Sequence, residues 1–263
     1  MRKPLYRNAL ALPLFFFALL LLTGCEELEE LLPDDKDKTT TYYGPVTKVG
    51  DGTARTWVKV SKDAKPLSIG INVTEEAVAS LQGKPSEVFL LELPEQGVLT
   101  PFRTVTLDWN MMGHPEVYFV PHFDAHFYMI SNAERLQIAA GPHVHAPEFA
   151  MNYMPANYTS GMFAVPQMGV HWEDQSEPQH HEGDFTRTLI YGAYQDEVIF
   201  YEPMFTVDYL EHLAPDSHKK MQIAQPPKVQ TTGYHPQSYT IGYDAIPGEY
   251  TIALTDLRYR KGE

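Results

Sequence analysis

The segment PHFDAHFY, residues 121–128, decides the fold of this 263-residue chain. In a β-strand, successive side chains point to opposite faces. One face of this strand then carries a polar row, made of His122, Asp124, His126 and Tyr128. The other face is apolar and can enter a core, whereas imidazoles and a carboxylate suit transition metals. The segment therefore predicts a strand between a core and a metal or proton-transfer site, with an exposed polar face as the alternative.

The sequence around this segment consists of short apolar runs separated by turn residues. Gly50-Asp51-Gly52 and Tyr194-Gln195-Asp196 each predict a hairpin turn between two strands. Residues 142–168 hold several prolines and aromatic residues and predict a long ordered loop. Short helices are expected at 75–81, 133–139 and 206–213. These features predict a mainly β chain, an antiparallel β-sandwich or barrel-like fold with a few short helices.

The N-terminus has the pattern of an export signal. Three basic residues precede the apolar stretch 9–22, which ends in Leu22-Thr23-Gly24-Cys25. This ending resembles the lipobox of bacterial lipoproteins, which implies that Cys25 carries lipid; a buried thiol beside an uncleaved anchor is the alternative. We expect a signal peptide at 1–24, an acidic tether at 25–41 and a β-rich domain at 42–263, which could divide into subdomains 42–112 and 113–263.

Composition limits the location and the partners of the chain. Cys25 is its only cysteine, so a lipidated chain has no thiolate ligand or thiol nucleophile left. The formal net charge of −14 excludes nucleic-acid binding as an expected function, because such binding depends on neutralising phosphates. The sequence therefore predicts a lipid-anchored protein of the cell envelope, on the periplasmic or extracellular face of a bacterial membrane.

Six of the eleven histidines lie between residues 114 and 171. Histidine is the commonest metal ligand in proteins. We expect one site for Zn, Mn or Fe, built from His122, Asp124, His126, His171 and Glu202. The alternatives are a metal-free network of hydrogen bonds and, for Glu202, a salt bridge to Arg187 or Arg103. Candidate ligand-binding residues around the site are His114, Tyr128, His143, His145 and Trp172, and the remaining histidines are expected at the surface.

Two classes of function fit these residues. The sequence has no Gly-x-Ser-x-Gly elbow and no His-Glu-x-x-His motif, and its one Ser-x-x-Lys lacks companion motifs. We therefore favour a binding or envelope-assembly protein that holds a small molecule or a partner subunit. The alternative is a metal-dependent enzyme acting on a small molecule, in which the ion lowers the pKa of bound water.

Several motifs also resemble those of a family of uncharacterised bacterial exported proteins and lipoproteins, a domain of unknown function. They occur in the same order within residues 46–213: DWN (108–110), HP (114–115), PHFDAHFYM (121–129), MGVHW (168–172), FT (185–186), IYG (190–192) and EPM (202–204). Some members of that family form ring-shaped homo-oligomers. The resemblance implies a β-rich fold and self-association, and it implies no reaction.

Overall fold

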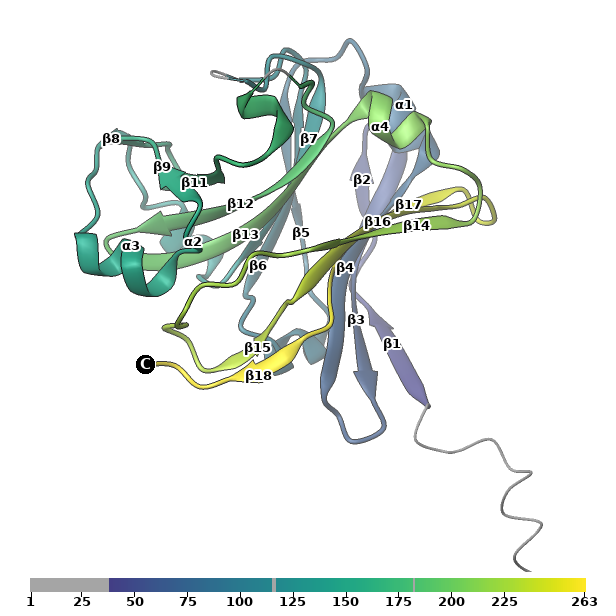
Figure 1. Ribbon diagram of the computed structural model, residues 1–263. Helices are drawn as coiled ribbons and strands as arrows, with labels where there is room; N and C mark the ends of the chain where they lie inside the picture. The colour runs from purple at the N-terminus through teal and green to yellow at the C-terminus, as the bar shows by residue number, and fades with distance from the viewer. Residues whose placement is uncertain (1–37, 115–116, 182) are drawn as a thin grey trace, which may run out of the picture. The chain divides into compact units, whose positions relative to one another are not determined.

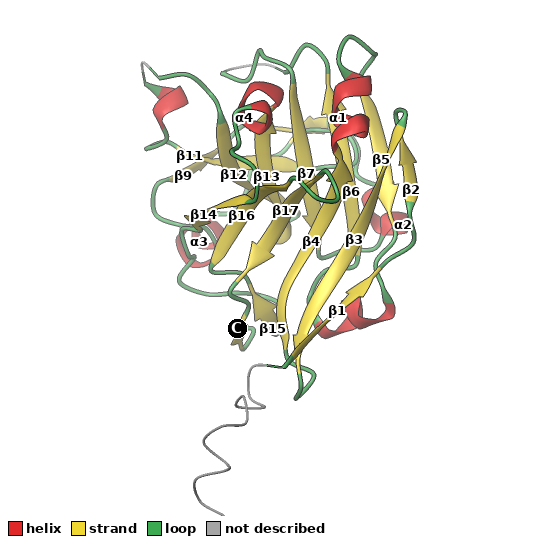
Figure 2. Cartoon of the chain, turned by 90° about the vertical axis from the view of Figure 1, so that its right-hand side faces the viewer, coloured by secondary structure: helices red, strands yellow, loops and turns green. Residues whose placement is uncertain are grey.

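Two antiparallel sheets face each other in the computed structural model, which describes residues 38–114, 117–181 and 183–263 (Figures 1 and 2). Each has seven strands within these residues. Sheet one runs in the order β1 (Thr39–Tyr43), β3 (Gly52–Ser61), β4 (Pro66–Thr74), β17 (Glu249–Thr255), β16 (Ser238–Asp244) and β14 (Ser217–Gln222), with β2 (Thr47–Val49) paired to β3.

Sheet two carries the segment quoted above. Its order is β5 (Glu87–Leu91), β6 (Thr104–Asn110), β7 (His122–Tyr128), β13 (Glu197–Thr206), β12 (Arg187–Tyr194), β11 (Val170–Asp174) and β9 (Tyr158–Ser160). Two short pairs are added by β8 (Gly141–Pro142) with β10 (Phe163–Ala164) and by β15 (Gly233–His235) with β18 (Arg258–Arg260). The predicted antiparallel sandwich is confirmed, and both sheets end in separate edge strands instead of closing into a barrel.

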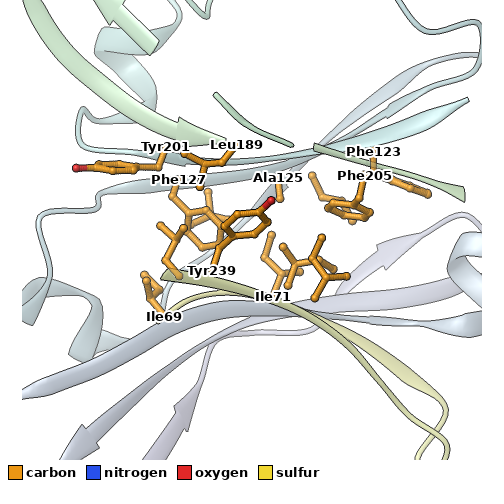
Figure 3. Close-up of a cluster of buried hydrophobic side chains, with 14 of the residues drawn as sticks. Ile69, Ile71, Phe123, Ala125, Phe127, Leu189, Tyr201, Phe205 and Tyr239 are labelled. Atoms are coloured by element: carbon orange, nitrogen blue, oxygen red, sulfur yellow. The ribbon is translucent and has the colours of Figure 1, made fainter. Parts of the chain in front are cut away.

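The core lies between the two sheets. Figure 3 shows Phe123, Ala125 and Phe127 of β7 facing Ile69 and Ile71 of β4 across this space. All five side chains are fully buried. Burial of large apolar side chains is the main favourable term in folding. The apolar row of the PHFDAHFY segment therefore has the predicted place in the core.

The polar row of β7 is buried as well. All seven residues of the strand are shielded from solvent, although His122, Asp124 and His126 point away from the core. Side chains such as Tyr118, Phe185 and Ile138 from outside the sheet pack over this outer face, so the alternative of an exposed polar strand face is wrong. Buried polar groups need partners, and β7 therefore requires a polar site on its outer face.

Local signals fix several of the other elements. The helix α1 (Glu75–Leu81) has the predicted bounds, and the Thr74 side chain accepts a hydrogen bond from the amide of Ala77 at its N-terminus. The β12–β13 hairpin turns through Gln195 and Asp196, both with positive φ, as a tight hairpin turn requires. The helices α2 (Asn132–Arg135) and α4 (Val207–Glu211) are shorter than predicted.

Two regions differ from the sequence predictions. The segment 142–168 contains the helix α3 (Pro147–Tyr153) and short strands as well as loop. Strand β1 begins at Thr39, inside the predicted tether, because it pairs with β3. Residues 1–37, with the predicted signal peptide and Cys25, lie outside the described residues. In the part of the chain that is described, no helix has the length and apolarity needed to cross a membrane.

Candidate metal centre

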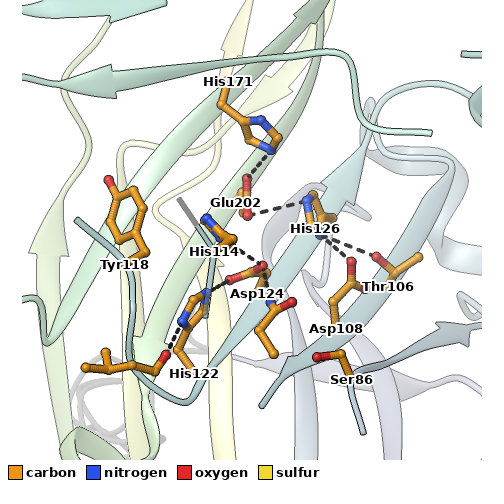
Figure 4. Close-up of polar contacts among 12 residues, drawn as sticks. Ser86, Thr106, Asp108, His114, Tyr118, His122, Asp124, His126, His171 and Glu202 are labelled. Carbon is orange, nitrogen blue, oxygen red and sulfur yellow. Dashed lines mark hydrogen bonds and ion pairs between the residues drawn. The ribbon is translucent and has the colours of Figure 1, made fainter. Parts of the chain in front are cut away.

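Four strands of sheet two bring polar side chains to its outer face. The face is set by the alternation of each strand: β6 supplies Asp108, β7 supplies His122, Asp124 and His126, β11 supplies His171 and β13 supplies Glu202. The neighbouring residues in these strands, such as Leu107 and Tyr201, enter the core. Two groups of three potential ligands result, and Figure 4 shows them side by side.

The first group, called here the His126 triad, consists of His126, His171 and Glu202, with one ligand atom of each within 4.8 Å of the others. Nε2 of His126 lies 3.4 Å from Oε1 of Glu202, and Nε2 of His171 lies 3.6 Å from Oε2. His126 and Glu202 are fully buried, whereas the His171 side chain is 20 % exposed. The triad is therefore a buried carboxylate between two imidazoles, open to solvent on the side of His171.

Asp108 lies beside Nδ1, the other ring nitrogen of His126. Its Oδ2 lies 3.4 Å from Nδ1 of His126, and the hydroxyl of Thr106 lies 3.5 Å from the same nitrogen. Burial and the nearby charge of Asp124 raise the pKa of Asp108 to about 8. Histidine ligands of metals usually have a carboxylate, carbonyl or water next to their second nitrogen, which orients the ring, and Asp108 occupies that position beside His126.

Burial also favours the uncharged forms of the side chains in the His126 triad. It raises the pKa of Glu202 well above the ordinary value, with the negative charges of Asp124 and Asp108 adding to the effect. Burial lowers the pKa of His126 to about 3 and that of His171 to about 4. At neutral pH both imidazoles are therefore neutral bases, beside a carboxyl whose protonated form is favoured by burial, so nitrogen lone pairs are available to an ion.

The second group, the His122 triad, consists of His114, His122 and Asp124, again with one ligand atom of each within 4.8 Å of the others. Nε2 of His122 lies 3.2 Å from Oδ1 of Asp124, and Nε2 of His114 lies 3.8 Å from Oδ2. Nδ1 of His122 donates a 2.7 Å hydrogen bond to the carbonyl of Val120, and the Asn110 amide donates one of 2.6 Å to Asp124. This triad is therefore held in place on both sides.

The His122 triad differs from the first triad because its charged forms, and not its uncharged forms, are favoured. Burial by itself would lower the pKa of His122, but the contact with Asp124 raises it above the ordinary value. Burial would likewise raise the pKa of Asp124, but the contact with His122 brings it below the ordinary value. Without a cation, the contact between these two side chains therefore favours an imidazolium–carboxylate pair.

Apolar clusters cover the same face at both ends of the polar row. One cluster consists of Tyr118, Phe185, Ile190 and Met204, and the other of Tyr128, Ile138, Ile199 and Phe200. The Phe200 ring packs against His126 at 4.9 Å and against His171 at 5.6 Å between ring centroids. It lies over Gly192, where an added Cβ would be 1.9 Å from the ring. Gly192 thus makes room for the side chain that supports both histidines of the His126 triad.

The five residues expected to form one site are divided between the two triads. His126, His171 and Glu202 meet in one, while His122 and Asp124 meet in the other together with His114. Glu202 has no salt bridge to Arg187 or Arg103 among the described contacts, and its partners are the two histidines. Tyr128 stacks on His126 at 5.2 Å with nearly parallel rings. It therefore lies beside the first triad, as expected for a residue around the site.

Three other expected site residues lie elsewhere. Trp172 follows His171 in β11 and so points to the opposite face, where it is buried in the core. His143 stacks on Tyr194, and His145 lies 3.0 Å from Asp196 at the β12–β13 turn. Neither belongs to a triad. Trp172 does not lie around the site as expected, because neighbouring residues of a strand do not share a face.

The sequence predictions missed several polar positions that the structure places in or near the site or in the interior. Asp108 and Asn110 could have been found by pairing the strand 103–109 with the PHFDAHFY segment, which places Asp108 opposite Asp124. Of the histidines expected at the surface, His235 is buried and His180 is partly buried. His235 is 2 % exposed and accompanies Tyr201, and His180 lies 3.4 Å from Glu173. In these two cases the polar residues next to the histidine in the sequence did not indicate how far its side chain is shielded from solvent.

Comparison with known proteins gives one partial match. A family model described as TTHB210-like, hypothetical protein TTHB210, matches residues 61–109, from the end of β3 to β6. The matched part includes Asp108 and stops before every histidine of the two triads. No curated protein and no solved structure matches the chain. Residues 61–109 are therefore similar to an uncharacterised family, and nearly all of the quoted motifs lie outside the matched part. The triads have to be interpreted from their own geometry.

Proposed function

We propose that this chain binds a divalent transition metal ion through His126, His171 and Glu202. The observation that carries the proposal is the pair of buried atoms at the centre of the triad. Nε2 of His126 and Oε2 of Glu202 have no hydrogen-bond partner among the described residues. Such atoms are rare in folded proteins and costly when buried. A cation between them would satisfy both and would also reach Nε2 of His171.

The donor set indicates which ions would bind. Two imidazole nitrogens and one carboxylate oxygen suit Zn, Mn or Fe, and no thiolate is present to select a softer ion. Asp108 would accept a hydrogen bond from Nδ1 of His126 and fix the ring that presents Nε2. The competing account is a metal-free network in which the protonated Glu202 and the imidazoles hold one another.

Elemental analysis of full-length protein, purified without chelators or an affinity tag, tests the proposal. We expect metal in the wild type and its loss from this triad in His171→Ala, since that histidine is partly exposed and its removal leaves the core intact. The matched control is His218→Ala, which removes an exposed histidine outside both triads. Equal metal content in wild type, His171→Ala and His218→Ala would contradict the proposal.

We also propose that the chain is attached to a membrane by lipid on Cys25. The support is the sequence alone, namely the basic start, the apolar stretch and the ending Leu22-Thr23-Gly24-Cys25. Cys25→Ala should release the protein from membranes washed in high salt, while the wild type stays with them. Retention of the variant would show a different means of attachment.

With lipid on Cys25, the metal site would belong to an envelope protein that binds a small molecule or another subunit. Sedimentation of detergent-purified protein would show whether this protein is a homo-oligomer.

A second candidate function is a metal-dependent enzyme acting on a small molecule. The observation in its favour is that the His126 triad offers three protein ligands, as catalytic zinc sites do, with solvent access at His171. Such an ion keeps a position for water or substrate, whereas a structural zinc site is usually closed. Cobalt-loaded protein should then change its visible spectrum when azide is added. An unchanged spectrum would favour the binding protein.

A further inference from the structure

We propose that His114, His122 and Asp124 form a second metal site, so that the chain holds two ions instead of one. This site lies beside the His126 triad on the outer face of sheet two (Figure 4) and shares no ligand with it. It goes beyond the function proposed above and does not depend on it. Either triad can bind an ion if the other does not.

His122 has the geometry of an oriented metal ligand. Its Nδ1 donates to the carbonyl of Val120 at 2.7 Å, which leaves Nε2 as the atom that faces Asp124. Metal-binding histidines are commonly fixed by such a bond from the other nitrogen to a backbone carbonyl. Nδ1 of His126 also faces a polar group, since it lies 3.4 Å from Oδ2 of Asp108. The strand thus presents two histidines, each with Nδ1 beside an oxygen atom and Nε2 beside a carboxylate.

The atoms that face each other in this triad lack hydrogen bonds. Nε2 of His122 and Oδ1 of Asp124 lie 3.2 Å apart, yet neither has a partner of hydrogen-bond geometry among the described residues. Both residues are almost completely buried. Unsatisfied polar atoms in such a position need an explanation. A cation coordinated by both atoms supplies one.

The remaining parts of the triad complete the site. Asn110 donates a hydrogen bond to Oδ2 of Asp124 and so holds the carboxylate in position. His114 lies on the solvent side, with 37 % of its side chain exposed and its Nε2 3.8 Å from the same oxygen. The His114 and His122 rings are 4.8 Å apart between centroids. A nitrogen ligand at the surface gives an ion a path into the buried part of the site.

The ion class is the same as at the first triad. Two imidazoles and one carboxylate suit zinc, and cobalt or manganese can replace it. A buried imidazolium–carboxylate pair uses the same atoms when no metal is present. The number of ions bound per chain separates the two accounts, because an ion pair binds none.

The test measures zinc bound per chain by equilibrium dialysis followed by elemental analysis. The full-length protein is purified in detergent without a tag, stripped with a chelator and dialysed against micromolar zinc. We expect two ions in wild type, one in His114→Ala, one in His171→Ala and none in the double variant. His218→Ala is the control and should keep two. Circular dichroism and thermal melting of the metal-free variants confirm that each is folded, and His114→Ala is chosen because that residue is partly exposed.

Each result assigns the two triads separately. One ion in wild type, kept in His114→Ala and lost in His171→Ala, overturns the second site and leaves the proposed function standing. One ion kept in His171→Ala and lost in His114→Ala supports the second site and overturns the first. Folded His114→Ala with two ions, or wild type with none, overturns the second site.

Discussion

Asp108 and Asp124 lie directly opposite each other in the β6–β7 ladder, on the outer face of sheet two. Both carboxyls are buried, and ionisation of one of two neighbouring carboxyls disfavours ionisation of the other. In the structure one carboxyl is ionised and the other is mostly protonated at neutral pH. Asp124 remains ionised because His122 faces it, whereas burial and the charge of Asp124 raise the pKa of Asp108 to about 8. The pair therefore carries a single negative charge at neutral pH.

Replacement of Asp108 by asparagine should weaken metal binding and reduce the loss of stability with pH. Loss of the carboxylate behind a ligating histidine typically lowers affinity by about 10–100-fold. Because the pKa of Asp108 is raised by folding, the wild type loses stability as pH increases from about 4 to 8. The variant has no such group, so its free energy of unfolding should fall less over this pH range, by up to about a few kcal/mol. Urea unfolding of chelated protein at pH 5 and pH 8 measures the difference, and parallel losses in both proteins would contradict the raised pKa.

Metal affinity of the His126 triad should continue to rise with pH above neutrality. The pKa values of His126 and His171, about 3 and 4, are too low for protons to compete there. The raised pKa of Glu202 means that an ion must displace a proton from that carboxyl. Displacement of one proton gives about a tenfold gain in affinity per pH unit.

Competition with a chelator of known affinity between pH 6 and pH 8 measures this dependence. The comparison is Glu202→Gln, which should bind more weakly and with little dependence on pH in this range. His114→Ala in both backgrounds removes the contribution of the His122 triad. A flat profile in the protein that retains Glu202 would show that this carboxyl is already ionised.

The substitution Gly192→Ala should weaken both folding and metal binding. An added Cβ would lie 1.9 Å from the Phe200 ring, so the ring has to move, and it supports His126 and His171. Overpacking of this kind costs about 1–3 kcal/mol. The control is Gly161→Ala, where an added Cβ has no neighbour within 4 Å. Urea unfolding and zinc titration of the two variants test the role of Phe200, and equal behaviour of the variants would contradict it.

The core of the sandwich should depend on Phe127 far more than on the equally large Phe163. Phe127 is fully buried between the sheets, whereas Phe163 is 62 % exposed. Phe127→Ala should lower the free energy of unfolding by about 3–5 kcal/mol. Phe163→Ala should change it by less than about 0.5 kcal/mol. Similar losses in the two variants would mean that Phe163 is covered in the native protein, for instance by another subunit.

Much of the fold could be predicted because its signals are local. Alternation in the PHFDAHFY segment, the Thr74 cap and the Tyr194-Gln195-Asp196 turn each depend on a few neighbouring residues. Strand β14 was missed because its residues, Ser217–Gln222, are mostly exposed and polar and gain their place only by pairing with β16. Long-range pairing of this kind leaves little trace in a single sequence.

The sequence predicted most of the residues of the candidate site, but it did not predict which histidine lies beside which carboxylate. The two-residue period of β7 placed His122, Asp124 and His126 on one face, and the apolar surroundings of Glu202 indicated burial. Which histidine meets which carboxylate depends on the order β6-β7-β13-β12-β11, which no local pattern encodes. Trp172 was assigned to the site together with its neighbour His171, although strand alternation places adjacent residues on opposite faces.

The central position of β7 makes metal retention an indicator of correct strand register. The strand is hydrogen-bonded to β6 on one side and to β13 on the other. A slip of one residue moves every side chain to the opposite face. Such a misfolded chain would place three imidazole or carboxylate groups between the sheets and would lose both triads at once. After refolding from denaturant, the fraction of chains able to take up an ion would therefore measure the fraction that paired β7 in register.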